Sequence, residues 1–247
     1  MNINNKALMF ALLMGSTAIG GYAVETVSST PAWIKDHVEV GTRITYFMLR
    51  DDHRDFFGGN RFYGSINDLD VKQQYLPIKV FVAYKFNPYF GVELSLEQLD
   101  VETWSRNPQD GNSWTDGTIN LIGPIASVYA RYPNATRFTP YAGLGLGYFF
   151  ADFDYNAAWH HPADVQNYDP TFYQEFQLDD SLGWLVYGGV TANLTERWAL
   201  DLQVRYMKLD VDGITLSSRG GSPYYENGSF TFPMSNTSVG VGIRYSF

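Results

Sequence analysis

The sequence predicts an all-β protein, an eight-stranded antiparallel up-and-down barrel that crosses a membrane through its strands. Three observations support this fold: apolar residues alternate with small or polar ones, short connections alternate with long ones, and the composition is unusual. Aromatic residues make up 17% of the chain, while charged residues, also 17%, fall below the roughly 25% of soluble domains. After Lys6, no run approaches the roughly 20 apolar residues that a membrane-spanning helix requires.

The N-terminal residues 1–23 have the features of a secretory signal peptide. Lys6 supplies the positive charge, residues 7–19 form a short apolar segment, and Gly21 and Ala23 are the small residues expected before a cleavage site. The alternative, an N-terminal membrane anchor, is disfavoured because the apolar segment is too short. We expect residues 24–36 to form a periplasmic leader and residues 37–247 to form the barrel.

Eight segments show the period-2 alternation of a strand with one apolar face. The last, residues 235–247, is the most regular, because every second residue from Val239 to Phe247 is apolar or aromatic. The other seven cover residues 38–48, 76–86, 90–96, 118–132, 142–150, 182–194 and 198–206. In the fourth of these segments, Gly123 and Pro124 are candidates for a β-bulge.

The connections between these segments alternate in length. Those after the second, fourth and sixth segments contain only a few residues. Those after the first, third, fifth and seventh are long, at about residues 50–74, 104–117, 151–181 and 210–234. Short periplasmic turns and long outer loops are typical of outer-membrane barrels, and closure removes the sheet edges that lipid cannot satisfy. We therefore predict a monomer in a bacterial outer membrane, with both termini on the periplasmic side.

Several of these segments resemble a known family. TPYAGLGLGY at residues 139–148 resembles the fifth strand of OmpW-type proteins, and LDDSLG at 178–183 is similar to the start of their sixth. Residues 193–206 and the VGVGIRY run at 239–245 also fit this family. Loops one, three and four differ from it, and the wider group of OmpA- and OmpX-like barrels remains an alternative. The resemblance implies the same barrel fold and the passage of small hydrophobic compounds.

The opposite parity of each segment faces the lumen. Ten ionisable residues occupy such positions: Glu39, Arg43, Lys79, Lys85, Glu93, Glu97, Arg131, Asp201, Arg205 and Arg244. The lumen of an eight-stranded barrel is only wide enough for side chains to fill it, and an unpaired buried charge is costly. We therefore expect these four acids and six bases to pair and to form a salt-bridged plug.

Toward the outer half of the barrel, the inward positions become apolar. The residues concerned are Phe47, Leu121, Ile125, Phe149, Leu185 and Met207. An apolar funnel above a charged plug would suit a small hydrophobic molecule that enters from outside and leaves sideways into the bilayer. The alternative is that these side chains only pack against one another beneath the loops.

The long connection at residues 151–181 is rich in acids and contains neither Lys nor Arg. Its ionisable residues are Asp152, Asp154, His160, His161, Asp164, Asp169, Glu175, Asp179 and Asp180. Such residues could bind a divalent ion, but adjacent histidines on an extended segment point in opposite directions. A solvated acidic loop, bridged by calcium to lipopolysaccharide phosphates, is the favoured interpretation, so we expect no specific metal site and no cofactor.

The sequence also bears on other classes of function. None of the four histidines lies in mid-strand beside a serine, so we expect no enzyme, including one that modifies lipid A. The glycines at 143, 145 and 147 precede no helix and do not form a phosphate loop. A net charge of −9 argues against nucleic acid as a partner.

The expected partners are outer-membrane lipid or lipopolysaccharide and a small hydrophobic ligand. The alternative is a surface structural or adhesion protein, or a phage or colicin receptor, that acts through its loops.

Overall fold

The computed structural model describes residues 34–50, 68–71, 78–106, 113–155, 173–218 and 225–247. Eight strands form the barrel: β1 (Val38–Leu49), β3 (Ile78–Lys85), β4 (Phe90–Arg106), β5 (Ser113–Arg131), β6 (Phe138–Tyr155), β8 (Ser181–Asn193), β9 (Trp198–Lys208) and β12 (Asn236–Ser246). Four more strands are β2 (Asp68–Val71), which pairs with β4 in the same sheet, and β7 (Tyr173–Leu178), β10 (Asp210–Ser218) and β11 (Tyr225–Pro233). Among the described residues, no helix is long and apolar enough to span a membrane.

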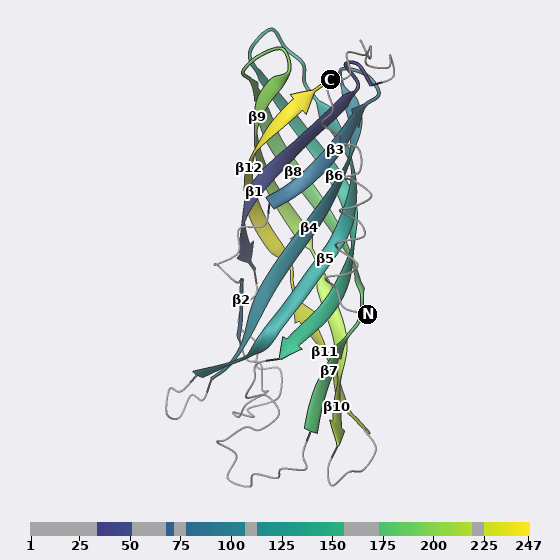
Figure 1. Ribbon diagram of the computed structural model, residues 1–247, viewed down its shortest axis with the longest axis vertical. Helices are drawn as coiled ribbons and strands as arrows, with labels where there is room; N and C mark the ends of the chain where they lie inside the picture. The colour runs from purple at the N-terminus through teal and green to yellow at the C-terminus, as the bar shows by residue number, and fades with distance from the viewer. Residues whose placement is uncertain (1–33, 51–67, 72–77, 107–112, 156–172, 219–224) are drawn as a thin grey trace, which may run out of the picture.

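The eight barrel strands form a closed antiparallel ring, as predicted (Figure 1). Neighbouring strands follow the order β4-β3-β1-β12-β9-β8-β6-β5, and β5 pairs back with β4. β1 pairs with β12 from Glu39↔Ser246 to Leu49↔Asn236, so the first and last barrel strands are joined along nearly their whole length. Closure satisfies the backbone groups of every strand inside the ring.

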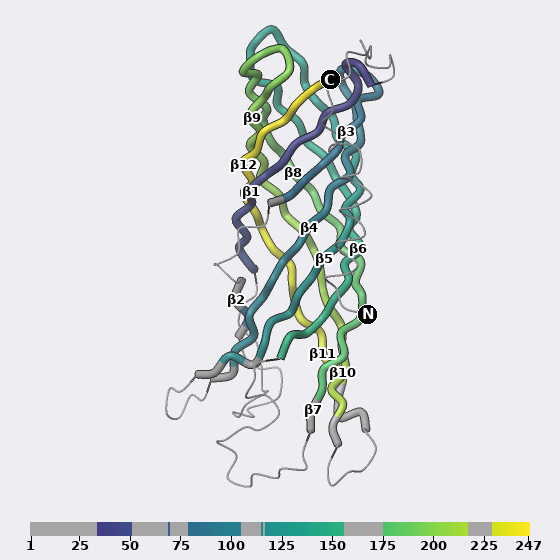
Figure 2. Tube along the Cα trace, viewed as in Figure 1, coloured from purple at the N-terminus to yellow at the C-terminus, as the bar shows by residue number. Residues whose placement is uncertain are grey.

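The short turns gather at one end of the barrel, which we call the short-turn end; the opposite end is the long-loop end (Figure 2). The turn between β3 and β4 shows how the sequence makes such a turn. The Asn87 side-chain oxygen accepts hydrogen bonds from the backbone N–H groups of Tyr89 and Phe90, at 2.8 and 2.9 Å. This Asx-type turn satisfies the N–H groups of Tyr89 and Phe90 within the turn itself.

The outer face of the barrel is apolar, and the strands alternate between this face and the lumen. Along β8, Leu182, Trp184 and Val186 are exposed, whereas Leu185 and Tyr187, of the opposite parity, are buried. Leu182 is 67% exposed. In water, a continuous apolar band of this kind would be costly, but in a bilayer it contacts hydrocarbon.

Aromatic pairs lie at both ends of this apolar band. At the short-turn end, the rings of Trp198 and Tyr245 are in edge contact, with centroids 4.8 Å apart. Toward the long-loop end, Trp184 and Tyr206 form a similar pair at 5.7 Å. Aromatic girdles at the two interfaces are typical of outer-membrane barrels.

Two details of the predicted elements are wrong. The long connections are not simply loops, because they contain β2, β7, β10 and β11 and because β4, β5 and β6 extend beyond their predicted ends. β11, β10 and β7 form a separate three-stranded sheet. These strands form because inward residues such as Val211 and Phe232 continue the apolar interior, and both are buried.

The predicted bulge is also misplaced. Gly123 and Pro124 keep a continuous register with β4, through Glu97↔Gly123 and Leu96↔Pro124. The β5–β6 register is likewise the same on both sides of them. The irregularity in the β4–β5 ladder lies instead at Thr103 and Trp104. The predicted signal peptide and nearly all of the predicted leader lie outside the described residues.

Inward glycines make room for large aromatic side chains on the same strand or a neighbouring one. A Cβ atom at Gly143 would lie 2.6 Å from the Tyr187 hydroxyl oxygen and 2.6 Å from the Val128 carbonyl oxygen. A Cβ atom at Gly147 would lie 2.7 Å from the Phe149 ring. The glycine row of β6 therefore has a packing role.

We predict that Gly143→Ala lowers the free energy of unfolding by about 1–3 kcal/mol, because the added methyl group overpacks the lumen against Tyr187. Urea titration of the protein in lipid vesicles measures this change. Gly188→Ala is the matched control, since the nearest atom that its Cβ would meet on another strand, the Tyr141 carbonyl oxygen, is 3.8 Å away. Equal effects of the two substitutions would contradict the packing role.

Candidate functional site

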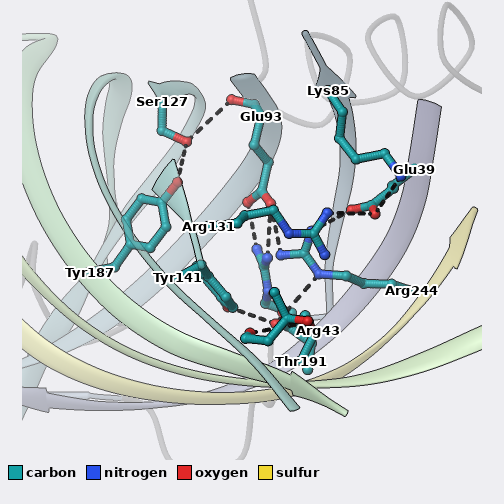
Figure 3. Close-up of polar contacts among 12 residues, drawn as sticks. Glu39, Arg43, Lys85, Glu93, Ser127, Arg131, Tyr141, Tyr187, Thr191 and Arg244 are labelled. Carbon is teal, nitrogen blue, oxygen red and sulfur yellow. Dashed lines mark hydrogen bonds and ion pairs between the residues drawn. The ribbon is translucent and has the colours of Figure 1, made fainter. Parts of the chain in front are cut away.

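The ten charged residues predicted to face the lumen lie in two groups inside the barrel. The larger group, here the lower ion-pair cluster, lies nearer the short-turn end and contains Glu39, Arg43, Lys85, Glu93, Arg131, Asp201 and Arg244 (Figure 3). The smaller group, here the upper ion-pair cluster, contains Lys79, Glu97 and Arg205.

Arg43 joins two acids from other strands in the lower ion-pair cluster. Its Nη1 and Nη2 atoms donate to the two carboxylate oxygens of Glu93 at 2.6 and 2.9 Å, and its Nε donates to Asp201. The side chains of all three residues are at most 5% exposed. A two-pronged bond of this kind fixes the guanidinium plane, and Gly242 on β12 leaves room for the arginine stem.

Arg244 on β12 contacts the same acids from the next strand. Its Nη1 lies 3.0 Å from Glu39, its Nη2 lies 3.3 Å from Glu93, and its Nε lies 3.4 Å from Asp201. The last of these contacts is an ion pair without hydrogen-bond geometry, because Arg244 Nε has no hydrogen-bond partner. The two arginines on paired strands β1 and β12 therefore hold three carboxylates between them.

Two further bases and a tyrosine complete the lower ion-pair cluster. Arg131 Nη1 and Lys85 Nζ lie 2.9 and 3.2 Å from the same Glu39 oxygen. The Tyr141 hydroxyl donates to Asp201 at 2.6 Å. The cluster thus links β1, β3, β4, β5, β6, β9 and β12 across the lumen.

The upper ion-pair cluster shares a single carboxylate between two cations. Arg205 Nη1 and Nη2 bind the two oxygens of Glu97, each at 2.5 Å, and Lys79 Nζ lies 2.7 Å from Glu97 Oε1. Glu97 is 1% exposed. The two cations also lie over the Phe47 ring, 4.7 Å from its centroid for Lys79 Nζ and 5.7 Å for Arg205 Cζ.

Phe81 is a member of this interior that the sequence analysis missed. Its ring lies 4.0 Å from the Arg43 guanidinium and 4.7 Å from that of Arg244, and it is 2% exposed. The signal was present, because Phe81 has inward parity on β3 and lies opposite Gly41, where a side chain would collide with its ring. Tyr187 was missed as well; its hydroxyl lies 3.0 Å from Ser127 Oγ.

The six residues predicted to form an apolar funnel are all buried, at 0–5% exposure. They belong to one larger apolar cluster, whose further members include Leu99, Val101, Ile119, Phe153, Phe176, Leu209, Val211, Phe232 and Met234. Strand register places Leu185 and Met207 opposite each other, two residues farther toward the long-loop end than the facing pair Tyr187 and Arg205. Leu185 and Met207 therefore lie just beyond the upper ion-pair cluster, while other members of the same apolar cluster, such as Tyr141 and Tyr187, lie among the ion pairs.

The acidic connection provides no metal centre in the part of it that is described. No group of three acidic, histidine or cysteine residues among the described positions is arranged to hold a metal ion. His160, His161, Asp164 and Asp169 lie outside the described residues. Asp180, which is described, accepts hydrogen bonds from the Tyr148 hydroxyl and the Ala151 backbone, both at 3.3 Å.

A closed ring of alternating strands, apolar outside and ion-paired inside, defines a β-barrel of the outer-membrane type. Comparison with known families agrees. Residues 23–247 match the family described as "Outer membrane protein beta-barrel domain", and the chain belongs to this family. No curated protein matches the chain.

Solved structures give the same result for the fold. OprG from Pseudomonas aeruginosa is 16% identical, with a TM-score of 0.60 over 86% of this chain and 97% of that one. AlkL, solved in lipid bilayers, is also 16% identical, with a TM-score of 0.54 over 93% and 96% of the two chains. E. coli outer membrane protein W matches at 16% identity and a TM-score of 0.40, over 86% and 98%. The predicted resemblance to OmpW-like barrels is confirmed; at this identity, the likeness concerns the fold.

We predict that Glu97→Gln lowers the free energy of unfolding by about 3–5 kcal/mol, because it leaves Lys79 and Arg205 as buried cations without their shared carboxylate. Urea titration in lipid vesicles measures the loss, and Glu196→Gln in an exposed short turn is the control. Adding Lys79→Met to Glu97→Gln should restore part of the stability. If Glu97→Gln is as stable as the control, the upper ion-pair cluster is not a stabilising contact.

Proposed function

We propose that this protein binds small hydrophobic molecules in the apolar cluster at its long-loop end and passes them sideways into the outer membrane. The observation that carries the proposal is the order of the layers along the lumen. Apolar side chains lie toward the long-loop end, and two ion-pair clusters lie beneath them. A molecule without charge gains nothing by displacing these ion pairs, so the axial route is unfavourable for it.

The strand pairing supports a lateral route. At the long-loop end, β1 ends at Leu49 and β3 begins only at Ile78. The strands on either side of them reach farther: β4 extends to Arg106, and β11 precedes β12 in the chain and continues its direction. β2 and β11 are the outermost strands of their sheets, and among the described residues they do not pair with each other. Met207 lies beneath this break, since the same Asn236 of β12 is opposite both Leu49 and Met207.

In this proposal, the short turns and both termini face the periplasm and the long-loop end faces outward. A hydrophobic molecule would enter among the strands of the long-loop end, rest against residues such as Phe47 and Met207, and leave between β2 and β11. The side chains in its path are fully packed in the free protein, so passage requires them to change rotamers. The lumen would hold the molecule briefly, and the bilayer would receive it.

We predict that Phe47→Ala combined with Leu185→Ala raises the flux of a small hydrophobic solute into protein-containing liposomes several-fold, because it removes bulk from the apolar cluster. Flux of a polar solute of similar size should stay low, since both ion-pair clusters remain. Ile44→Ala with Val186→Ala is the matched control, because these residues lie on the same two strands and face outward. No flux through the wild-type protein, and none through the double variant, would refute the conduit.

A second candidate function is favoured by the three-stranded sheet of β11, β10 and β7, which extends beyond the barrel at the long-loop end (Figure 1). The Tyr155 hydroxyl donates to the Phe176 carbonyl oxygen at 3.0 Å and accepts from the Phe176 backbone N–H at 2.6 Å. These bonds fix β7 against the end of β6. A rigid projecting sheet of this kind suits a surface protein that meets host, phage or colicin ligands.

We predict that deleting residues 156–172 and closing the gap with a short glycine linker leaves hydrophobic flux in liposomes unchanged, because the apolar cluster is built from the strands. Under the surface-receptor function, the same deletion abolishes binding of whole cells to host surfaces or phage. Loss of flux together with retained surface binding would contradict both assignments. The unboiled mobility of the variant in a detergent gel verifies that the barrel has folded.

A further inference from the structure

A cavity of about 400 Å³ lies on the outer wall of the barrel, at the junction of β9 with β10 and of β11 with β12. It is lined by Arg50, Tyr206, Lys208, Asp210, Thr231, Pro233 and Ser235. Tyr206 and Lys208 have outward parity on β9, since Arg205 and Met207, of the opposite parity, are buried in the lumen. The cavity therefore opens toward the membrane side of the wall and is separate from the apolar cluster.

Strand register fixes the level of this cavity relative to the apolar band. Met48 and Tyr206 lie on either side of Thr237 in one outward row, and Met48 is 43% exposed. Arg50 and Lys208 each lie two residues farther toward the long-loop end, which is about 7 Å. Lys208 is opposite Trp184, one of the aromatic residues that mark the edge of the apolar band. Leu182, two residues beyond Trp184 on β8, is still exposed, so the two cations lie near the long-loop edge of the apolar band, where the lipid headgroups meet the hydrocarbon.

The cavity carries two cations and one acid. The Arg50 guanidinium lies 5.7 Å from the centroid of the Tyr206 ring, and no described carboxylate forms an ion pair with it. Lys208 Nζ lies 2.7 Å from Asp210, and both of these side chains are 41% exposed. Such an exposed ion pair contributes little, so an incoming anion can compete with Asp210 for the lysine. A second carboxylate, Asp212, adjoins the cavity, but it accepts a hydrogen bond from the Thr231 hydroxyl, so Arg50 is the cation of the lining without a carboxylate partner among the described residues.

We propose that this cavity binds a phosphate group of lipid A, the lipid part of lipopolysaccharide. A phosphate has the acceptor geometry for the planar donor fork of Arg50, and Lys208 adds a second positive charge from β9, on the other side of β12. Tyr206 stacks beneath the guanidinium and holds it at the interface. A lipid seated here would lie against Met48 and Trp184 with its acyl chains. The inference does not depend on the conduit, because it concerns the outer wall, but it rests on the proposed orientation in which the long-loop end faces outward.

The test uses the full-length protein in phosphatidylcholine nanodiscs that contain bisphosphorylated lipid A, with bound lipid counted by native mass spectrometry. We expect Arg50→Gln or Lys208→Gln to weaken lipid A binding about fivefold, and the double variant about thirtyfold. The matched control is Lys35→Gln with Arg137→Gln, which removes the same charge from exposed positions at the short-turn end. The control should bind lipid A as the wild type does.

Two further arms distinguish the source of the phosphate. Dephosphorylated lipid A should bind equally weakly to the wild type and to the double variant, because the two cations contact the phosphate that it lacks. Inorganic phosphate at the same concentration should not displace lipid A, since it lacks the acyl chains that contact the wall. Equal binding of lipid A by the wild type and the double variant overturns the proposal. Displacement by inorganic phosphate overturns the lipid assignment and leaves a free-phosphate site.

Discussion

The pairing of β1 with β12 is the contact on which the rest of this structure depends. It joins the two ends of the barrel sequence through eleven residue pairs and leaves no unpaired edge within the eight-stranded ring. In lipid, an open edge would expose backbone groups that nothing could satisfy. The same pairing also places Arg43 and Arg244 side by side in the lumen, so closing the barrel and assembling the lower ion-pair cluster are a single event.

The narrow lumen then determines how the interior is filled. Six cations and four acids share it, and each large side chain needs an adjacent small one. Gly242 leaves room for Arg43, Gly41 for Phe81 and Gly143 for Tyr187. The aromatic rings cover the faces of the guanidinium groups and thereby shield them from water. The same few neighbouring residues therefore pair the buried charges, fill the lumen and form the cation–π contacts.

The barrel is asymmetric along its axis and around its circumference. Ion pairs occupy the lumen toward the short-turn end, and apolar residues occupy it toward the long-loop end. β4, β5 and β6 extend far toward the long-loop end, whereas β1 ends at Leu49 and β3 begins only at Ile78. The wall is therefore uneven at this end. The cavity around Arg50 and Lys208 lies on the β9–β12 side of this uneven rim. The proposed lateral route and the proposed lipid site therefore lie next to each other at the long-loop end.

The sequence alone predicts the existence and order of the eight barrel strands and the inward or outward parity of their residues, because a period of two is a local property of the chain. It also identified the ten lumen charges, since parity alone assigns them to the interior. It did not determine the ion-pair partners of these charges. Glu97, for example, pairs with both Lys79 and Arg205, and Arg205 lies 108 residues away from it in the sequence. Nor did it reveal Phe81 beneath two arginines or the sheet of β7, β10 and β11. Those arrangements depend on strand register and stagger around the closed ring, which only the tertiary structure fixes.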